Sequence, residues 1–202
     1  MIDHILIGAP ELSMGIDYVF EKTKFLAAAG GKHPQWNTQN ALLSLGVEVY
    51  LEIISPIPGL NPRPPFQILS SLDRPKPITW AVKTRDIQGT ADLLNRLKLG
   101  HSGIVAGTRL KTDGSQLNWM LMFPENNYGG IIPFFIEWDN KSIHPALTAP
   151  KGLRLNRLDL YHPDPELILN LLESLGLDCR CNFSDEIRLE LFIQDDLGVY
   201  KL

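Results

Sequence analysis

The feature that most constrains the fold is a segment that recurs three times along the chain. The copies begin at residues 2, 78 and 155 and read IDHILIGAPELSMGIDYV, ITWAVKTRDIQGTADLL and LNRLDLYHPDPELILNLL. Each copy has a short apolar run, a polar turn and then apolar residues at helical spacing, such as Ile87, Ala91 and Leu94 in the second copy. The recurrence predicts three modules that each open with a strand and an amphipathic helix. Three copies at so long a period favour modules that share one sheet over a solenoid.

Further apolar runs follow each helix and predict a βαβββ module. The expected strands lie near residues 41–45, 47–54, 102–110, 116–123, 131–138, 177–181, 187–194 and 198–202. Proline-rich loops at 55–66 and 74–77, and the segment 140–152, separate the modules.

These boundaries predict an α+β fold. Two βαβββ modules, at about residues 1–56 and 78–139, are expected to form a curved, mixed and largely antiparallel sheet around a pocket. The pair makes up a domain of residues 1–150, and residues 151–202 form a partial third module packed on the same domain.

Composition narrows the classes of partner. The chain of 202 residues is 44% hydrophobic and 21% charged, within the range of soluble globular proteins. A net charge of -4, with no block of Lys and Arg, argues against nucleic acid. The sequence shows neither a signal peptide nor an apolar run long enough to span a bilayer, so we expect no membrane partner and a cytoplasmic location.

Ionisable residues interrupt two strongly apolar strands, VYLEIIS with Glu52 and PFFIEWD with Glu137. An unpaired carboxylate is costly in such surroundings, which favours a carboxylate that is paired, protonated or bound to a cation. Because strand residues alternate between faces, His4 is expected to share a face with Ile2 and Leu6. In the repeat, Trp80 is expected at the position of His4, and Glu137 at that of Glu52.

The module and its polar positions resemble the vicinal oxygen chelate superfamily, which includes glyoxalases, extradiol dioxygenases and bleomycin-resistance proteins. More closely, the chain resembles the uncharacterised glyoxalase-like domain group. The motifs that carry this likeness are IDHILIGAPEL, GGKHPQWNTQNALLSLG, VYLEIISP, WAVKTRD, DG-x-x-x-x-W from Asp113 to Trp119, IPFFIEWD and HPA.

Superfamily members commonly bind a divalent metal through four such positions. The resemblance implies His4, Glu52 and Glu137 as ligands in this chain, because the indole of Trp80 cannot ligate. One histidine with two carboxylates is compatible with Zn, Mn, Fe or Ni. For each of the three residues, the alternative is a buried or paired side chain without a chemical role.

Other residues are candidates for proton transfer and substrate binding. Glu52, Glu137 and His33, which is expected in a loop, are candidate catalytic groups, and Arg109 could bind a substrate carboxylate unless it is a solvated hairpin residue. His101, His144 and His162 lie in linkers or turns and are assigned no chemistry. The candidate pocket walls, for which core packing is the alternative, are Tyr50, Trp80, Trp119 and Phe135.

Two classes of function follow for a small-molecule ligand. The first is a metal-dependent isomerase or lyase of glyoxalase type that acts on a small oxygenated substrate. The second is a metal-free protein that sequesters a small molecule, as the resistance proteins of the superfamily do. A structural or partner-binding role is a third alternative, and an edge-to-edge homodimer is compatible with the module.

Overall fold

The computed structural model describes residues 1–110 and 116–202, with side chains for all of these except residues 109 and 110. Its strands form an eight-stranded sheet in the order β2-β3-β4-β1-β5-β8-β7-β6 and a four-stranded sheet in the order β10-β9-β11-β12. The strands are β1 (Ile2–Gly8), β2 (Ala28–His33), β3 (Thr38–Ser44), β4 (Tyr50–Pro56), β5 (Lys76–Lys83), β6 (His101–Leu110), β7 (Gln116–Pro124), β8 (Phe134–Trp138), β9 (Arg154–His162), β10 (Arg180–Phe183), β11 (Arg188–Gln194) and β12 (Val199–Lys201).

Three of the helices, α1, α2 and α4, lie where the repeat predicts them, and α3 lies in the segment 140–152 that was predicted only to separate modules. Asp86 caps α2 by accepting a hydrogen bond from the backbone of Gly89, and Pro165 opens α4. The α-helices are α1 (Leu12–Thr23), α2 (Ile87–Arg96), α3 (Pro145–Thr148) and α4 (Pro165–Ser174), and the short 3-10 helices are η1 (Gln67–Ser71) and η2 (Tyr128–Gly130).

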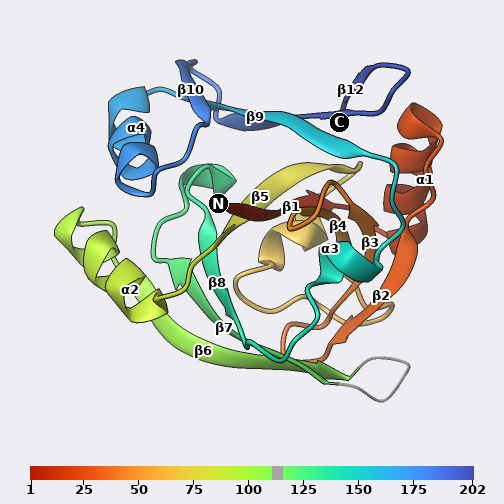
Figure 1. Ribbon diagram of the computed structural model, residues 1–202, viewed down its shortest axis with the longest axis horizontal. Coiled ribbons are helices and arrows are strands. Elements are labelled where there is room, and N and C mark those ends of the chain that lie inside the picture. Colours follow the sequence, from red (N-terminus) through yellow and green to blue (C-terminus); the bar gives the residue numbers. More distant parts are fainter. Residues whose placement is uncertain (111–115) are drawn as a thin grey trace.

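The large sheet consists of two matched halves joined at its centre. Strand β1 runs parallel to β4 and antiparallel to β5, and β5 runs parallel to β8. The sheet curls strongly, as Figure 1 shows, so that its two outermost strands, β2 and β6, approach one another. The predicted fold class, a curved mixed sheet built from tandem βαβββ modules, is confirmed.

The outer face of the curled sheet carries the main core. Apolar residues of β1, β4, β5 and β8 pack there against α1, α2, α4 and the four-stranded sheet, in one continuous cluster. Figure 1 shows the four-stranded sheet along one side of the large sheet, with α4 at its end. The inner face carries a smaller cluster that includes Leu6, Ile54, Phe134 and Ile136, and this face holds the pocket.

Strand β2 was not predicted. Its sequence, AAGGKH, has little apolar signal because only its last residue, His33, is buried. The expectation that His33 lies in a loop is therefore wrong, since His33 ends β2 and pairs with Thr38 of β3.

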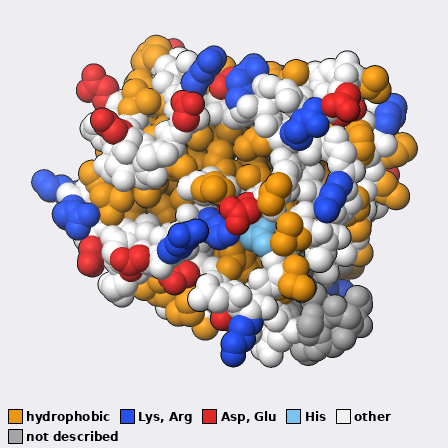
Figure 2. All heavy atoms as spheres, in the orientation of Figure 1, with side chains coloured by type: hydrophobic (Ala, Val, Ile, Leu, Met, Phe, Trp, Pro, Cys, Tyr) orange, Lys and Arg blue, Asp and Glu red, His pale blue; other side chains and the backbone are white. Residues whose placement is uncertain are grey.

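The surface is mixed in charge. Figure 2 shows Lys and Arg side chains interspersed with Asp and Glu over the viewed face. Within the described ranges, no helix has both the length and the apolar character needed to cross a membrane.

Candidate functional site

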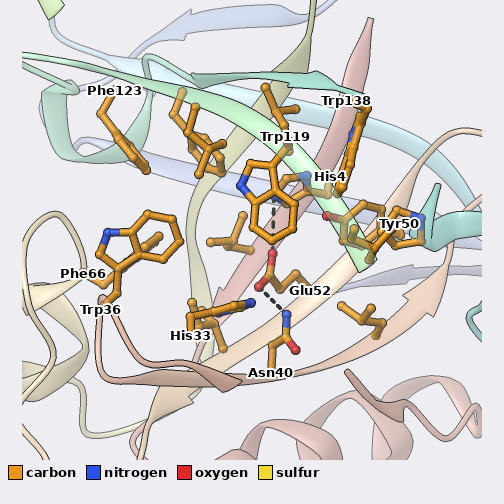
Figure 3. A pocket seen from close by; sticks show the side chains of 18 residues that line it. His4, His33, Trp36, Asn40, Tyr50, Glu52, Phe66, Trp119, Phe123 and Trp138 are labelled. Carbon is orange, nitrogen blue, oxygen red and sulfur yellow. Dashed lines mark hydrogen bonds and ion pairs between the residues drawn. The ribbon is translucent and has the colours of Figure 1, made fainter. Parts of the chain in front are cut away.

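A pocket opens on the inner face of the curled sheet, between the two halves. Its cavity volume is about 50 Å³, and one water needs roughly 10–15 Å³ on a comparable measure, so it accepts a chemical group of a few non-hydrogen atoms. Figure 3 shows the side chains that line it: His4, Leu6, His33, Trp36, Asn40, Leu42, Tyr50, Glu52, Ile54, Phe66, Leu117, Trp119, Leu121, Phe123, Phe134, Ile136, Trp138 and Pro145.

Three buried polar side chains from neighbouring strands meet in this pocket (Figure 3). The amide Nδ2 of Asn40 donates to Glu52 Oε1 at 2.7 Å, and its Oδ1 accepts from the backbone N–H of Gly31 at 2.8 Å. The second carboxylate oxygen, Glu52 Oε2, lies 3.4 Å from His4 Nε2. The amide of Asn40 is thus oriented by the backbone of β2, and it directs one oxygen of Glu52 while the other faces the imidazole.

A fourth polar residue, Asp3, holds the imidazole from behind. A β-bulge in β1 between Ile2 and His4 places Asp3 opposite no residue of β5. The side chain of Asp3 is fully buried, and its Oδ1 accepts from His4 Nδ1 at 2.6 Å. Its Oδ2 accepts from Trp138 Nε1 at 2.9 Å and from His144 Nε2 at 3.0 Å.

These donors keep Asp3 ionised. Burial by itself would raise the pKa of Asp3, but the hydrogen bonds from His144 and His4, together with the electrostatic attraction of the two rings, outweigh it and hold the pKa well below its usual range. Because an ionised carboxylate only accepts, the Nδ1 of His4 must carry a hydrogen. His144 is held in the opposite tautomer, since its Nδ1 accepts from the backbone N–H of Ala146 at 3.3 Å.

The contact between His4 and Glu52 favours one proton shared by the two side chains. With Nδ1 protonated, a neutral His4 presents the lone pair of Nε2 to Glu52 Oε2, and two acceptors 3.4 Å apart repel each other. A proton on either atom removes the repulsion. The pair thus holds a carboxylate oxygen against an imidazole nitrogen inside the pocket, while Asp3 keeps the imidazole in place.

Aromatic rings fix the imidazole and form the walls. Tyr50 stacks on His4 at 4.5 Å between ring centroids, and Phe134 meets His4 edge-on at 5.3 Å. On the other side of the pocket, Trp36, Phe66 and Phe123 pack edge to face against one another, with centroids 5.5–6.1 Å apart.

The predicted site residues divide into two groups. His4, Glu52, His33, Tyr50 and Trp119 all line the pocket. Trp80, Phe135 and Glu137 do not, so the expectation that the three metal-ligand candidates converge on one cavity is wrong for Glu137. The side chain of Arg109 lies outside the described residues.

The three misplaced residues face the outer side of the sheet. Trp80 and Phe135 are fully buried in the main core, where Trp80 Nε1 donates to the carbonyl of Ile131 at 2.8 Å. Glu137 Oε2 accepts from the backbone N–H of Ile87 at 2.9 Å, at the first turn of α2, where the helix dipole favours a negative charge.

Strand register gives the reason for the error. His4 pairs with Ala81, not with Trp80, which pairs with Ile5. Leu6 pairs with Glu52 between β1 and β4, and Lys83 pairs with Ile136 between β5 and β8. Ala81 and Ile136 belong to the inner cluster, whereas Trp80 belongs to the main core and Glu137 binds α2, so the predicted alignment placed Trp80 and Glu137 on the wrong face.

The donor set does not fit the divalent metal that the resemblance implies. On the inner face of β5 and β8, Ala81, Phe134 and Ile136 have side chains without donor atoms for a metal. In the described part of the chain, no three His, Cys, Asp or Glu side chains are grouped so as to hold a metal ion.

Several residues of the site carried weak sequence signals or none. The acidic Asp3 beside His4 and the polar Asn40 within NALLSLG were visible as polar interruptions of apolar strands. His144, to which no chemistry was assigned, belongs to the HPA motif and donates to Asp3. The inward turn of Asp3 depends on the bulge, which the sequence pattern does not reveal.

A curled sheet of two βαβββ halves around a pocket is the arrangement that the resemblance to glyoxalase-like domains implies. The family model described as a glyoxalase-like domain matches residues 2–176, and the chain belongs to this family. No curated protein sequence matches it.

Three solved structures are similar to this chain, with the identity, coverage and TM-score that follow. A hypothetical protein from Staphylococcus aureus is 15% identical, with 99% of this chain and 97% of that chain covered and a TM-score of 0.75. A methylmalonyl-CoA epimerase from Streptomyces coelicolor, in complex with 2-nitronate-propionyl-CoA, is 12% identical over 71% of this chain and 96% of that chain, with a TM-score of 0.47. The methylmalonyl-CoA epimerase from Mycobacterium tuberculosis is 14% identical over 73% and 90%, with a TM-score of 0.42.

Proposed function

We propose that this protein is an isomerase or lyase that binds a small molecule in the inner pocket and moves a proton with Glu52 and His4. The observation that carries the proposal is the row of contacts Asn40–Glu52–His4–Asp3 in and behind a largely apolar pocket, with a hydrogen bond at each end and 3.4 Å between Glu52 Oε2 and His4 Nε2. A buried carboxylate beside an oriented imidazole suits general acid–base catalysis, because protons can pass between them without bulk water.

Each polar residue has a distinct role in this proposal. With the shared proton on His4 Nε2, the carboxylate of Glu52 removes a proton from the substrate, and the imidazolium of His4 gives its own Nε2 proton to the product, which leaves one proton on the pair. Asp3 is a positioning residue that holds the Nδ1–H tautomer of His4, and Asn40 orients the carboxylate. His33 also lines the pocket and is a candidate contact to the substrate. No step requires a metal.

Sequestration of a small molecule without chemistry is the second candidate. Seven of the 18 lining residues are Trp, Tyr or Phe, which is the composition of a binding pocket whether or not a reaction follows. Apolar side chains at Ala81 and Ile136, in place of donors, are compatible with either candidate.

Deuterium exchange separates the two. Small α-hydroxy ketones and α-amino ketones would be incubated with the protein in deuterated water, and loss of the proton next to the carbonyl followed by NMR. We expect exchange with at least one compound, and we expect Glu52→Gln to slow it by about 10²–10⁴-fold, the usual contribution of a general base.

Glu48→Gln is the matched control, because Glu48 precedes β4 on the surface and pairs only with Lys83 at 3.2 Å among described contacts. Compounds that bind but never exchange, or equal exchange in Glu52→Gln and wild type, would favour sequestration.

A further inference from the structure

We infer that the pocket selects a small organic cation, of the size of a trimethylammonium or a protonated amine group. This inference rests on the proposed function, because it names the substrate class of the same site. Three properties of the pocket lead to it: the net charge of Glu52, His4 and the buried Asp3 behind His4, the absence of Lys and Arg from its described lining, and its aromatic walls.

The net charge of the polar group is negative whichever atom holds the shared proton. Asp3 is ionised, and the His4–Glu52 pair contains either an imidazolium with a carboxylate or a neutral imidazole with a carboxylic acid. In both arrangements the three residues together carry one negative charge. Loss of the shared proton would make the total two negative charges, so the group attracts a cation in every state considered.

Apart from the imidazoles of His4 and His33, the described lining holds no basic side chain that could offset this charge. None of the 18 residues around the pocket is Lys or Arg. A carboxylate or phosphate in the ligand would therefore meet a negative group at close range without a compensating cation, which is costly in a pocket of low polarity. A cationic ligand would instead be attracted by the negative group.

The walls suit a cation as well. The faces of aromatic rings attract ammonium groups, most strongly when water is excluded and when the ring is Trp. Trp36, Trp119 and Trp138 all line the pocket, and Figure 3 shows labelled aromatic side chains on several sides of Glu52. A quaternary ammonium has five non-hydrogen atoms, which matches the few-atom capacity of the cavity.

Two ligands of the same shape and different charge test the inference. Choline and 3,3-dimethyl-1-butanol differ only in the nitrogen, which is a neutral carbon in the second compound. Binding of each would be followed by the tryptophan fluorescence of the full-length protein and by calorimetry. We expect choline to bind about tenfold or more tightly than the neutral analogue.

Two variants test which residues cause the preference for choline over its neutral analogue. Glu52→Gln should reduce the ratio of the two affinities towards one, because it removes the charge of the carboxylate and keeps an oxygen that can accept from Asn40. Trp36→Leu, in the loop between β2 and β3, should reduce the ratio while retaining apolar area. Phe20→Leu is the control, since Phe20 is an exposed aromatic residue of α1.

The inference is overturned if the neutral analogue binds as tightly as choline, if neither binds up to about 10 mM, or if the ratio is unchanged in Glu52→Gln. Its failure can be told apart from failure of the proposed function. Deuterium exchange that depends on Glu52 without a preference for choline would leave proton transfer standing, and a preference for choline without exchange would leave only binding.

Discussion

Replacing Asp3 by Asn tests the polar arrangement at its most buried point. The carboxylate accepts three hydrogen bonds, from His4 at 2.6 Å, Trp138 at 2.9 Å and His144 at 3.0 Å. An amide keeps the shape of the side chain but has one accepting oxygen. That oxygen can still accept from Trp138 and His144, so the amide nitrogen must face His4.

The change in stability can be worked from these bonds. Hydrogen bonds to an ionised group contribute about 1.5–3 kcal/mol each, and neutral ones about 1 kcal/mol. Three charged bonds are replaced by three neutral ones, and removal of a buried charge offsets part of the loss. We expect the free energy of unfolding to fall by about 3 kcal/mol, and the melting temperature to fall by about 6–12 °C for a chain of this size.

The same substitution should reverse the tautomer of His4. An amide nitrogen donates, so Nδ1 of His4 becomes the acceptor and Nε2 carries the hydrogen that points to Glu52. Long-range nitrogen–proton NMR correlations distinguish the two tautomers, and proton-transfer activity should fall with the change. Asp17→Asn, at an exposed position of α1, is the control and should alter stability by less than about 0.5 kcal/mol. A variant as stable as this control, or one that keeps the Nδ1–H tautomer, would refute the reasoning.

Three further outcomes are expected. Gly107→Ala should weaken ligand binding, measured by fluorescence, because an added Cβ would collide with the indole of Trp119 and push it into the pocket; unchanged affinity would contradict this. The difference in free energy of unfolding between wild type and Asp3→Asn should be complete above about pH 5 and shrink as the pH falls towards 3, because the pKa of Asp3 is lower in the folded than in the unfolded chain. Urea unfolding at a series of pH values measures this difference, and a difference that stays constant with pH would contradict the prediction. Cys179 should react with iodoacetamide at pH 8 about a hundredfold more slowly in the folded than in the unfolded chain, because burial, helped by the charge of Asp178, raises the pKa of its thiol to about 11; equal rates would contradict this.

The fold could be predicted because its signal is spread over many residues. Apolar residues at helical spacing recur in three segments, and misassigning one of them does not change the module. Strand β2 was missed because AAGGKH is an edge strand with one buried residue, so little hydrophobic pattern marks it. The site depends on far fewer residues, and small errors of register matter more there.

His4 and Glu52 could be found from sequence because each is a polar residue in an apolar strand, on the face shared with Leu6 and with Ile54. Ile2, however, packs in the main core on the opposite side, against the prediction that it shares the face of His4. The bulge at Asp3 inserts one residue into the alternation of inward and outward side chains along β1. A sequence pattern of period two does not reveal such an insertion.

The corrected register also indicates how a ligand lies in the pocket. The first module contributes the polar atoms of His4, Asn40 and Glu52, and the second module contributes the apolar side chains of Ala81, Phe134 and Ile136 to the inner face. A ligand that satisfies both walls must therefore be polar or charged at one end and apolar at the other. Its reactive end faces the strands β1 and β4, and its apolar end lies against β5 and β8. Because the polar residues belong to the first module only, the proposed proton transfer takes place within one half of a pseudo-symmetric sheet. A substitution that adds a hydrogen-bond donor at Ile136 should therefore change ligand preference without altering His4 or Glu52.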